Sequence, residues 1–374
     1  YTTLFRSDII GSFHPDVVVD AILAKKNLGT RITDAPFVIG VGPGFYAGKD
    51  CHCVIETKRG HTLGNVIWEK EAIPNTGVPG NIGGFTTERL IRASADGIME
   101  PVAEIGDTVE KGQLVARTGK QPVYAKMSGI VRGMLQKDVQ VTEGLKIGDI
   151  DARCEPEHCG TISDKARAVG GGVLEAVSLF GQIYGNYGVA LLAAGEAKRF
   201  GSDKLSEKFQ GIPLYRHALE KLEAFSGLSR VVVTAREALA EEAQRLGIHI
   251  VENRQPEQGI SHSVSLALQE LLSQNPDLEG VLFLVCDQPG IQAATIQKIL
   301  NEGCLHKNSI VCAGYDGMRG NPVLWGSTYF QELMHLTGDT GGRQLMKQYE
   351  EKIRIVECAP EELKDIDRRE DMTE

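Results

Sequence analysis

The C-terminal half of the chain alternates short apolar runs with helical stretches. The apolar runs at 231–233, 249–251, 281–285 and 309–313 predict buried strands, and the stretches at 235–246 and 263–272 predict helices between them. Strands that alternate with helices are typical of a mainly parallel sheet flanked by helices. We therefore predict a Rossmann-like α/β domain over residues 188–374. In such a sheet, ligands bind beyond the carboxyl ends of the strands.

A second pattern, an internal repeat, fills residues 93–152. The segment at 95–114, which contains DGI and IGDTVEKGQL, is echoed at 127–149. Each copy predicts a strand, a turn rich in Gly and Asp, and another strand, so that two copies close a small β-barrel sandwich. The repeat resembles the biotinyl/lipoyl-type fold, whose carrier domains present a modifiable lysine on a hairpin. Lys126 falls on a predicted strand instead, which favours a structural barrel.

The remaining segments are punctuated by glycine. Turns between short strands are predicted over residues 1–92, and we interpret Gly40-x-Gly42-x-Gly44 as a loop because its spacing fits a dinucleotide fingerprint poorly. A helix interrupted by the glycines at 170–172 is predicted over 161–180, followed by a linker at 181–187. The predicted domains are a glycine-rich, incomplete α/β region (1–92), the β-barrel sandwich (93–152), a helix and linker (153–187) and the α/β domain (188–374).

Composition and charge limit the classes of function. The 374 residues carry a net charge of −10, which argues against nucleic-acid binding. No apolar run approaches the roughly 18–20 residues that cross a bilayer, so we expect no membrane span. We also see no secretory signal, expect reduced thiols, and predict a cytoplasmic protein. The sequence begins at Tyr1 and enters its first pattern abruptly, from which we expect a partial sequence.

The segment LLAAGEAKRFGSDK at 191–204 carries the clearest chemical signal. A short apolar strand runs into a turn of small residues that holds Lys198, Arg199 and Lys204. Small residues let backbone N–H groups approach an anion, and clustered cations neutralise it. The glycine spacing differs from that of a P-loop. We predict a triphosphate cradle formed by Leu192, Ala193, Ala194, Gly195, Gly201 and Lys204.

Asp287 follows the strongest apolar run of the chain, at 281–286, and precedes Gln288 and Pro289. A carboxylate there lies at the same edge of the sheet as the turn of small residues within 191–204, which we call the glycine turn. Nucleoside triphosphates bind with Mg²⁺, which prefers oxygen ligands, so Asp287 is our candidate Mg²⁺ ligand. The alternative is an Asp that begins the following turn.

Three polar loops are candidates for the rest of the site. The segment at 258–264 contains Ser261 and Ser263, which we predict either to contact the nucleotide or to cap the following helix. The loops at 320–324 and 338–343 contain Asn321, Asp339 and Arg343, which we predict to face a second, phosphate-bearing substrate.

Residues 188–374 resemble the MobA-like nucleotidyltransferases, and most closely their molybdenum cofactor cytidylyltransferase members. The motifs LAAGEAKRFGSDKL, GISHSV, CDQPG, GNPVLW, GDTGGRQLM and DIDRREDM occur in the order typical of that family. The resemblance implies that Gly195, Arg199 and Lys204 bind the triphosphate and that Asp287 coordinates Mg²⁺. Members that use GTP have Gly where Ala194 stands, so the resemblance favours CTP.

Residues 8–180 resemble the C-terminal part of an accessory protein of selenium-dependent molybdenum hydroxylase systems. The matching stretches include VIGVGPGF, ETKRGHTLGNVIWE and SDKARAVGGGVLEA. Together the two resemblances imply transfer of CMP from CTP to molybdopterin, with Lys204, Arg199 and Asp287 catalytic and a molybdenum hydroxylase as partner. The alternatives are another phosphate acceptor, such as a sugar or alditol phosphate, and a carrier of the cofactor without catalytic activity.

Overall fold

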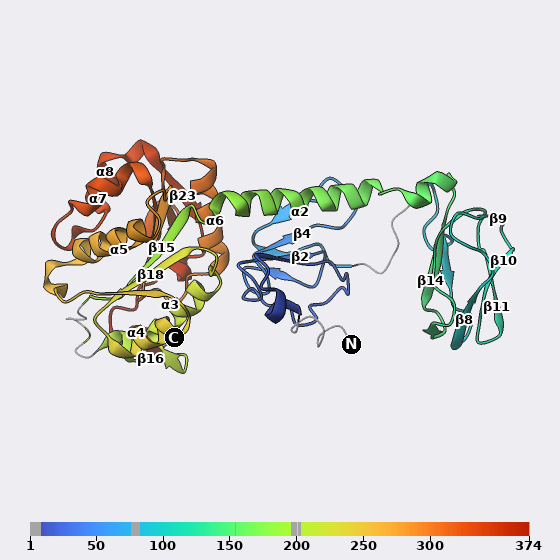
Figure 1. Ribbon diagram of the computed structural model, residues 1–374, viewed down its shortest axis with the longest axis horizontal. Coiled ribbons are helices and arrows are strands. Elements are labelled where there is room, and N and C mark those ends of the chain that lie inside the picture. Colours follow the sequence, from blue (N-terminus) through green and yellow to red (C-terminus); the bar gives the residue numbers. More distant parts are fainter. Residues whose placement is uncertain (1–8, 76–82, 154, 196–199, 201–202, 374) are drawn as a thin grey trace. The chain divides into compact units, whose positions relative to one another are not determined.

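The computed structural model describes residues 9–75, 83–153, 155–195, 200 and 203–373. The chain divides into two compact units (Figure 1). Unit 1 comprises Tyr1–Thr57, Gly64–Ile73 and Gly171–Glu374, and unit 2 comprises Lys58–Leu63 and Pro74–Gly170.

The C-terminal half of unit 1 is built on one seven-stranded sheet. Its strand order is β19-β18-β15-β20-β22-β21-β23, and the neighbours run parallel except that β22 is antiparallel to β20 and β21. The mainly parallel sheet predicted from the alternating pattern is therefore observed. The strands are β15 (Tyr187–Leu192), β18 (Ser229–Thr234), β19 (His249–Glu252), β20 (Gly280–Val285), β21 (Ile310–Tyr315), β22 (Met318–Gly326) and β23 (Ile353–Glu357).

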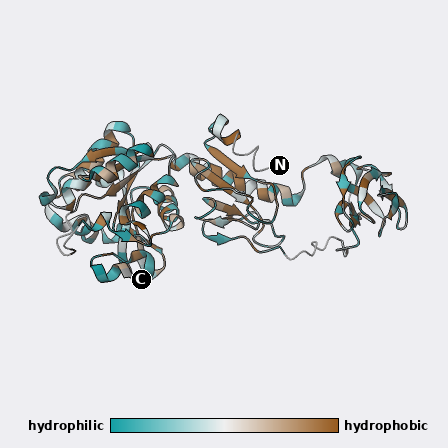
Figure 2. Ribbon diagram, turned by 90° about the horizontal axis from the view of Figure 1, so that it is seen from below, coloured by the Kyte–Doolittle hydropathy of each residue, from teal (hydrophilic) through white to brown (hydrophobic). Residues whose placement is uncertain are grey.

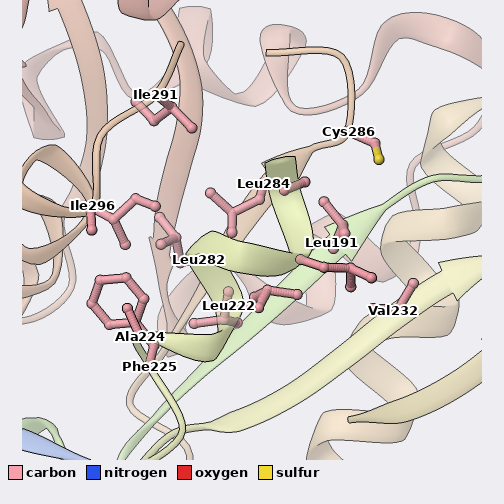
Figure 3. Packing of buried hydrophobic residues seen from close by; sticks show 14 of the residues in the cluster. Leu191, Leu222, Ala224, Phe225, Val232, Leu282, Leu284, Cys286, Ile291 and Ile296 are labelled. Atoms are coloured by element: carbon pink, nitrogen blue, oxygen red, sulfur yellow. The ribbon is translucent and has the colours of Figure 1, made fainter. Parts of the chain in front are cut away.

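Helices cover both faces of this sheet, because successive strand residues point to opposite sides. Leu191 and Leu282 pack with the helices of one face, and their neighbours Ala190 and Val281 pack with those of the other. Figure 3 shows Leu191, Leu282 and Leu284 lying together with Leu222 of α3. The first face carries α3 (Leu214–Glu223), α4 (Glu237–Arg245) and α6 (Ala293–Leu305), and the second carries α5 (Ile260–Gln274), α7 (Phe330–Met334) and α8 (Arg343–Gln348).

Short strands and turns of 3-10 helix lie between the longer elements of both units. A two-stranded ribbon consists of β16 (Lys208–Phe209) and β17 (Ile212–Pro213). The single turns of 3-10 helix are η1 (Pro156–Gly160), η2 (Lys204–Ser206), η3 (Pro256–Gln258), η4 (Ser327–Tyr329), η5 (Gly338–Thr340), η6 (Glu350–Lys352), η7 (Pro360–Leu363) and η8 (Arg369–Thr373).

Unit 1 also contains a smaller sheet from the N-terminal part of the chain. Its strands β1 (Val17–Asp20), β2 (Phe37–Val41) and β4 (Cys53–Ile55) are parallel, and β5 (Val66–Ile67) pairs antiparallel with β4. A separate ladder joins β3 (Tyr46–Ala47) and β6 (Lys70–Glu71). The loop predicted around Gly42 and Gly44 is present directly after β2, and both glycines have positive φ.

Helix α2 (Asp164–Ile183) differs from the prediction. The glycines at 170–172 do not interrupt it, and most of the predicted linker at 181–187 belongs to the end of α2 and the start of β15. One of these glycines, Gly172, is required by close packing, because a Cβ there would lie 2.0 Å from the carbonyl oxygen of Gly64. Farther along α2, Phe180 stacks on Phe37 of β2 with ring centroids 4.7 Å apart. These contacts keep the helix continuous despite the low helix propensity of glycine.

Unit 2 contains the repeat at 93–152, which folds together with the preceding strand β7 as two antiparallel four-stranded sheets around one core. Met99, Val115, Val131, Ile147 and Ile150 are buried in that core. The likeness to a biotinyl/lipoyl module stays a prediction. One sheet contains β11 (Gln121–Tyr124), β10 (Leu114–Thr118), β8 (Gly97–Pro101) and β13 (Gln140–Val141), and the other contains β7 (Leu90–Arg92), β14 (Lys146–Asp151), β12 (Gly129–Met134) and β9 (Thr108–Val109).

The hydropathy of the residues follows this layering. Figure 2 shows hydrophobic residues concentrated in the strands of each sheet and hydrophilic residues on the surrounding helices and loops. Among the described helices, none combines the length and the apolar character that a membrane span requires.

Candidate functional site

The carboxyl ends of β15 and β20 meet at a cavity of about 440 Å³. Parallel strands place the loops that follow them at one edge of the sheet, so the glycine turn after β15 and Asp287 after β20 arrive at the same place. The lining consists of Leu192, Ala193, Ala194, Gly195, Phe200, Lys204, Leu205, Pro256, Glu257, Gly259, Ile260, Ser263, Val285, Cys286, Asp287, Asp339 and Asp367.

Lys204 and Asp287 form the central contact of this cavity. The Lys204 Nζ atom donates to the Asp287 Oδ2 atom at 2.9 Å, and the Asp367 Oδ1 atom lies 3.6 Å from the same nitrogen. Lys204 is largely buried, whereas Asp287 and Asp367 are partly exposed. The backbone reinforces the arrangement, because the Ile366 N–H donates to the Asp287 carbonyl at 2.9 Å. Three distant segments of the chain therefore converge on one cation.

Carboxylates outnumber cations around this contact. Among the described residues that line the cavity, Glu257, Asp287, Asp339 and Asp367 are acidic and Lys204 is the cation. Next to them, burial and then the charge of Asp287 raise the pKa of Asp365, which accepts a 2.8 Å hydrogen bond from Gln288. The crowded carboxylates favour a ligand that brings further positive charge into the cavity.

The cavity also contains a cysteine, Cys286, whose surroundings argue against nucleophilic attack by its thiol. Cys286 lines the cavity beside Asp287, and burial raises the pKa of its thiol far above the ordinary value. A protonated, buried thiol is a poor nucleophile at neutral pH. The side chains therefore favour charge neutralisation and positioning over attack by Cys286.

Helix α5 begins at the cavity wall. Gly259 precedes its first residue with φ +83°, and a Cβ on this glycine would lie 2.6 Å from the Asp339 Oδ1 atom. Gly259 is the N-cap, so the prediction that Ser261 or Ser263 caps this helix is wrong. Ser263 lines the cavity, and its Oγ atom accepts a 3.0 Å hydrogen bond from Asn253. The first turn of a helix offers backbone N–H groups that favour an anion.

The structure assembles most of the predicted site residues and leaves others apart. Arg199 and Gly201 lie outside the described residues. Ser261 is buried in α5, Asn321 lies in β22, and Arg343 is the first residue of α8; none of these three lines the cavity, and their roles stay predictions. The predicted residues that do line it are Leu192, Ala193, Ala194, Gly195, Lys204, Ser263, Asp287 and Asp339.

Sequence reasoning missed Arg236 and Asp367. Arg236 lies two residues after the end of β18, which is two strands from β20 in the sheet, and it contacts the backbone of the glycine turn. No motif marks it, although a cation in the loop after a predicted parallel strand is a usable signal. Asp367 belongs to DIDRREDM, which the sequence supported only as part of a motif order.

The described side chains do not form a complete metal site by themselves. Within the described part of the chain, no group of three or more His, Cys, Asp or Glu side chains is arranged to hold a metal ion. Asp287 and Asp367 nevertheless present carboxylate oxygens to one side of the cavity. Mg²⁺ is commonly bound by one or two carboxylates together with substrate phosphates, and this donor set fits that mode.

Residues 189–353 match the model of the MobA-like NTP transferase domain. The C-terminal half of the chain is therefore similar to the domains of that family over these residues.

Three curated relatives share parts of the sequence. The uncharacterized protein YqeB of Escherichia coli (strain K12) is 54% identical over 171 residues, which cover 46% of this chain and 32% of YqeB. The purine catabolism protein PucB of Bacillus subtilis (strain 168) is 28% identical over 168 residues, 42% of this chain and 78% of PucB. A probable molybdenum cofactor guanylyltransferase of Thermococcus gammatolerans is 37% identical over 62 residues, 17% of this chain and 32% of that protein. The chain thus spans about a third of the length of YqeB.

Solved structures with some likeness include Rv0371c from Mycobacterium tuberculosis H37Rv. Its TM-score is 0.43 at 22% identity, covering 50% of this chain and 94% of that chain. The nucleotidyl transferase Mth528 from Methanothermobacter thermautotroptrophicus has a TM-score of 0.42 at 17% identity, covering 50% of this chain and 93% of that chain.

Proposed function

We propose that this protein transfers CMP from CTP to molybdopterin and releases pyrophosphate. The observation that carries the proposal is the contact between Lys204 and Asp287, which joins the glycine turn to the carboxyl end of β20 at the cavity. The match of residues 189–353 to the MobA-like NTP transferase domain supports nucleotidyl transfer. The choice of CTP rests on Ala194, and the choice of molybdopterin rests on the resemblances of both halves of the sequence.

In the proposed reaction, a terminal phosphate oxygen of molybdopterin attacks the α-phosphorus of CTP. A new P–O bond forms there, the bond from the α-phosphorus to the bridging oxygen breaks, and its electron pair leaves with pyrophosphate. The phosphate nucleophile needs no proton removed by a general base. The protein therefore contributes mainly positioning and charge stabilisation.

Lys204 is placed to provide that charge stabilisation. An ammonium group carries three N–H donors, and in the structure Asp287 and Asp367 face two directions around it. One donor direction remains for a phosphate oxygen in the cavity. In a largely buried setting, such a charge stabilises developing negative charge more strongly than it would in water.

The carboxylates of Asp287 and Asp367 would hold Mg²⁺ together with the triphosphate. The bound ion would neutralise negative charge on the phosphates. Asp287 also accepts the hydrogen bond from Lys204. The next residue, Gln288, donates to Asp365, so the loop after β20 is bonded both to the glycine turn and to the C-terminal segment. The backbone of Ala193, Ala194 and Gly195 provides the wall against which we place the nucleotide.

The test is pyrophosphate release by the purified chain incubated with Mg²⁺, molybdenum-loaded molybdopterin and each NTP in turn. Release with CTP that requires molybdopterin is the expected result. Release with CTP and a sugar or alditol phosphate, but not with molybdopterin, would replace the acceptor. No release with any NTP, together with retained binding of the cofactor, would favour a carrier without catalytic activity.

A further inference from the structure

The backbone of Arg236 is held against the end of β18. Arg236 lies two residues after the last residue of β18, and its backbone N–H donates to the Thr234 Oγ1 atom at 3.1 Å. The Thr234 hydroxyl in turn donates to the Ala193 carbonyl at 3.4 Å, and the Ala193 N–H donates to the Val233 carbonyl at 2.9 Å. The Arg236 side chain is 19% exposed. The start of the loop after β18 is therefore fixed against the end of β15.

The guanidinium group donates one hydrogen bond from each of its three nitrogens to the two described ends of the glycine turn. Nη1 donates to the Ala193 carbonyl at 2.5 Å and Nη2 donates to the Gly195 carbonyl at 3.1 Å. Nε donates to the Asp203 Oδ1 atom at 2.6 Å. A planar group with five fixed N–H donors is suited to bridge several acceptors at once, and a lysine is not.

These bonds orient groups that face the cavity. The peptide bond is planar and trans, so a carbonyl of Ala193 that points to Arg236 turns the N–H of Ala194 to the opposite side. Asp203, held by Arg236 and by the Ser206 hydroxyl, directly precedes Lys204 at the start of η2. Because Asp203 neutralises Arg236, this arginine is placed to hold the turn and not to meet a phosphate directly.

We infer that Arg236 is a positioning residue that clamps the ends of the glycine turn and thereby sets both the backbone of Ala194 and the place of Lys204. The inference rests on the proposed function for its kinetic consequence, but its structural content can be measured without turnover. Since Arg236 lies in the loop after β18, which neighbours β15, these contacts also tie the described ends of the turn to the sheet.

The first test is amide hydrogen exchange of the full chain without substrates, comparing the wild type with Arg236→Gln. We expect exchange at 193–195 and 203–206 to be at least about 10-fold faster in the variant, because lost charge-assisted bonds raise local opening. Arg254→Gln is the matched control, since Arg254 is exposed and pairs with Glu252 at the end of the adjacent strand β19. Unchanged exchange in Arg236→Gln would overturn the clamp.

The second test separates a positioning role from a general loss of structure. In Arg236→Gln we expect the KM for the nucleotide to rise about 10-fold or more, with the KM for the acceptor within twofold of the wild type. Adding Asp203→Asn to this variant should change the nucleotide KM little further, because the contact between Asp203 and Arg236 is already lost in Arg236→Gln. Equal increases in both KM values, or fully additive effects, would contradict the inference. If the wild type shows no turnover with any NTP, the proposed function fails, and the exchange experiment still decides the clamp.

Discussion

At the scale of single residues, Lys204 connects the two halves of the cavity. It is carried by the turn that follows β15, and its partners Asp287 and Asp367 come from the loop after β20 and from the C-terminal segment. A buried cation between two carboxylates is fixed in position before a substrate arrives. This preorganisation is the property that an electrostatic catalyst requires.

Replacing Lys204 by Ala should lower kcat for pyrophosphate release by about 10²–10³-fold, the range observed when one preorganised donor is removed. The measurement is steady-state turnover with CTP and molybdopterin. Lys208→Ala is the control, because Lys208 is an exposed lysine of β16 close in sequence. Turnover of the Lys204 variant within a few-fold of the wild type would rule out its proposed role.

Replacing Asp287 by Asn should raise the Mg²⁺ concentration needed for half-maximal turnover, because an amide oxygen is a weaker ligand than a carboxylate. We expect an increase of about 10-fold or more in a titration of rate against Mg²⁺. The exposed Asp277 provides the control variant Asp277→Asn. An unchanged Mg²⁺ dependence would remove Asp287 from the metal site.

The residues that the sequence revealed and those that it hid differ in a physical way. Lys204 and Asp287 each lie in the segment after an apolar strand, and the parallel pairing of these strands brings the two segments to one edge of the sheet. Asp367 reaches Lys204 only through the path of the C-terminal segment, and Arg236 acts through backbone carbonyls that leave no pattern in the sequence. Tertiary contacts of this kind require coordinates.

At the scale of elements, the start of α5 forms one wall of the cavity and depends on a glycine. Gly259 adopts φ +83°, and a side chain there would collide with Asp339 and with the backbone of Gly338. Sequence patterns predicted the helix but not its first residue, because the serines at 261 and 263 resemble caps. They also predicted a break in α2 that packing of Gly172 against Gly64 prevents.

Gly259→Ala should lower the free energy of unfolding by about 1–3 kcal/mol, the usual range for strained backbone, and weaken nucleotide binding. Gly247→Ala is a matched control. Gly247 also has positive φ, at +67°, but nothing lies within 4 Å of a Cβ there. We expect the control to show the smaller destabilisation and unchanged nucleotide affinity in denaturant and titration experiments. Equal effects of the two changes would mean that contact with Asp339 is unimportant.

His52 joins β4 to the end of α3 in its neutral form. Its Nδ1 atom accepts from the Val38 N–H at 2.9 Å, so Nε2 carries the proton and donates to the Ala224 carbonyl at 2.6 Å. Burial lowers the pKa of His52 to about 4. The unfolded chain binds a proton near pH 6.5, so the folded state loses stability as pH falls from about 6.5 to 4.

We therefore compare the unfolding free energies of the wild type and His52→Gln. We expect the difference between them to shrink by up to about 3 kcal/mol as pH falls from 7.5 to 4.5. Tryptophan fluorescence in denaturant is the appropriate measurement, because Trp68 and Trp325 both belong to unit 1. A difference between the two proteins that stays constant over this pH range would show that His52 is not held neutral.

At the scale of the whole molecule, the match to the MobA-like NTP transferase domain covers residues 189–353 and leaves the N-terminal segments outside it. The alternating pattern predicted the mainly parallel sheet of 188–374 because that signal is local, whereas the β-barrel sandwich predicted from the repeat at 93–152 stays a prediction. The parallel sheet formed by β1, β2 and β4 was not predicted, since its strands are short and separated by glycine-rich loops. The resemblance of residues 8–180 to a molybdenum hydroxylase accessory protein stays a prediction.

The most direct measurement of the central claim follows the α-phosphate of the nucleotide. The purified chain is incubated with Mg²⁺, molybdenum-loaded molybdopterin and CTP labelled at the α-phosphate, and the cofactor is then isolated. Our account predicts that the label appears in the cofactor together with an equal amount of pyrophosphate, and that Lys204→Ala transfers far less. An unlabelled cofactor, with pyrophosphate absent or formed without molybdopterin, would contradict it.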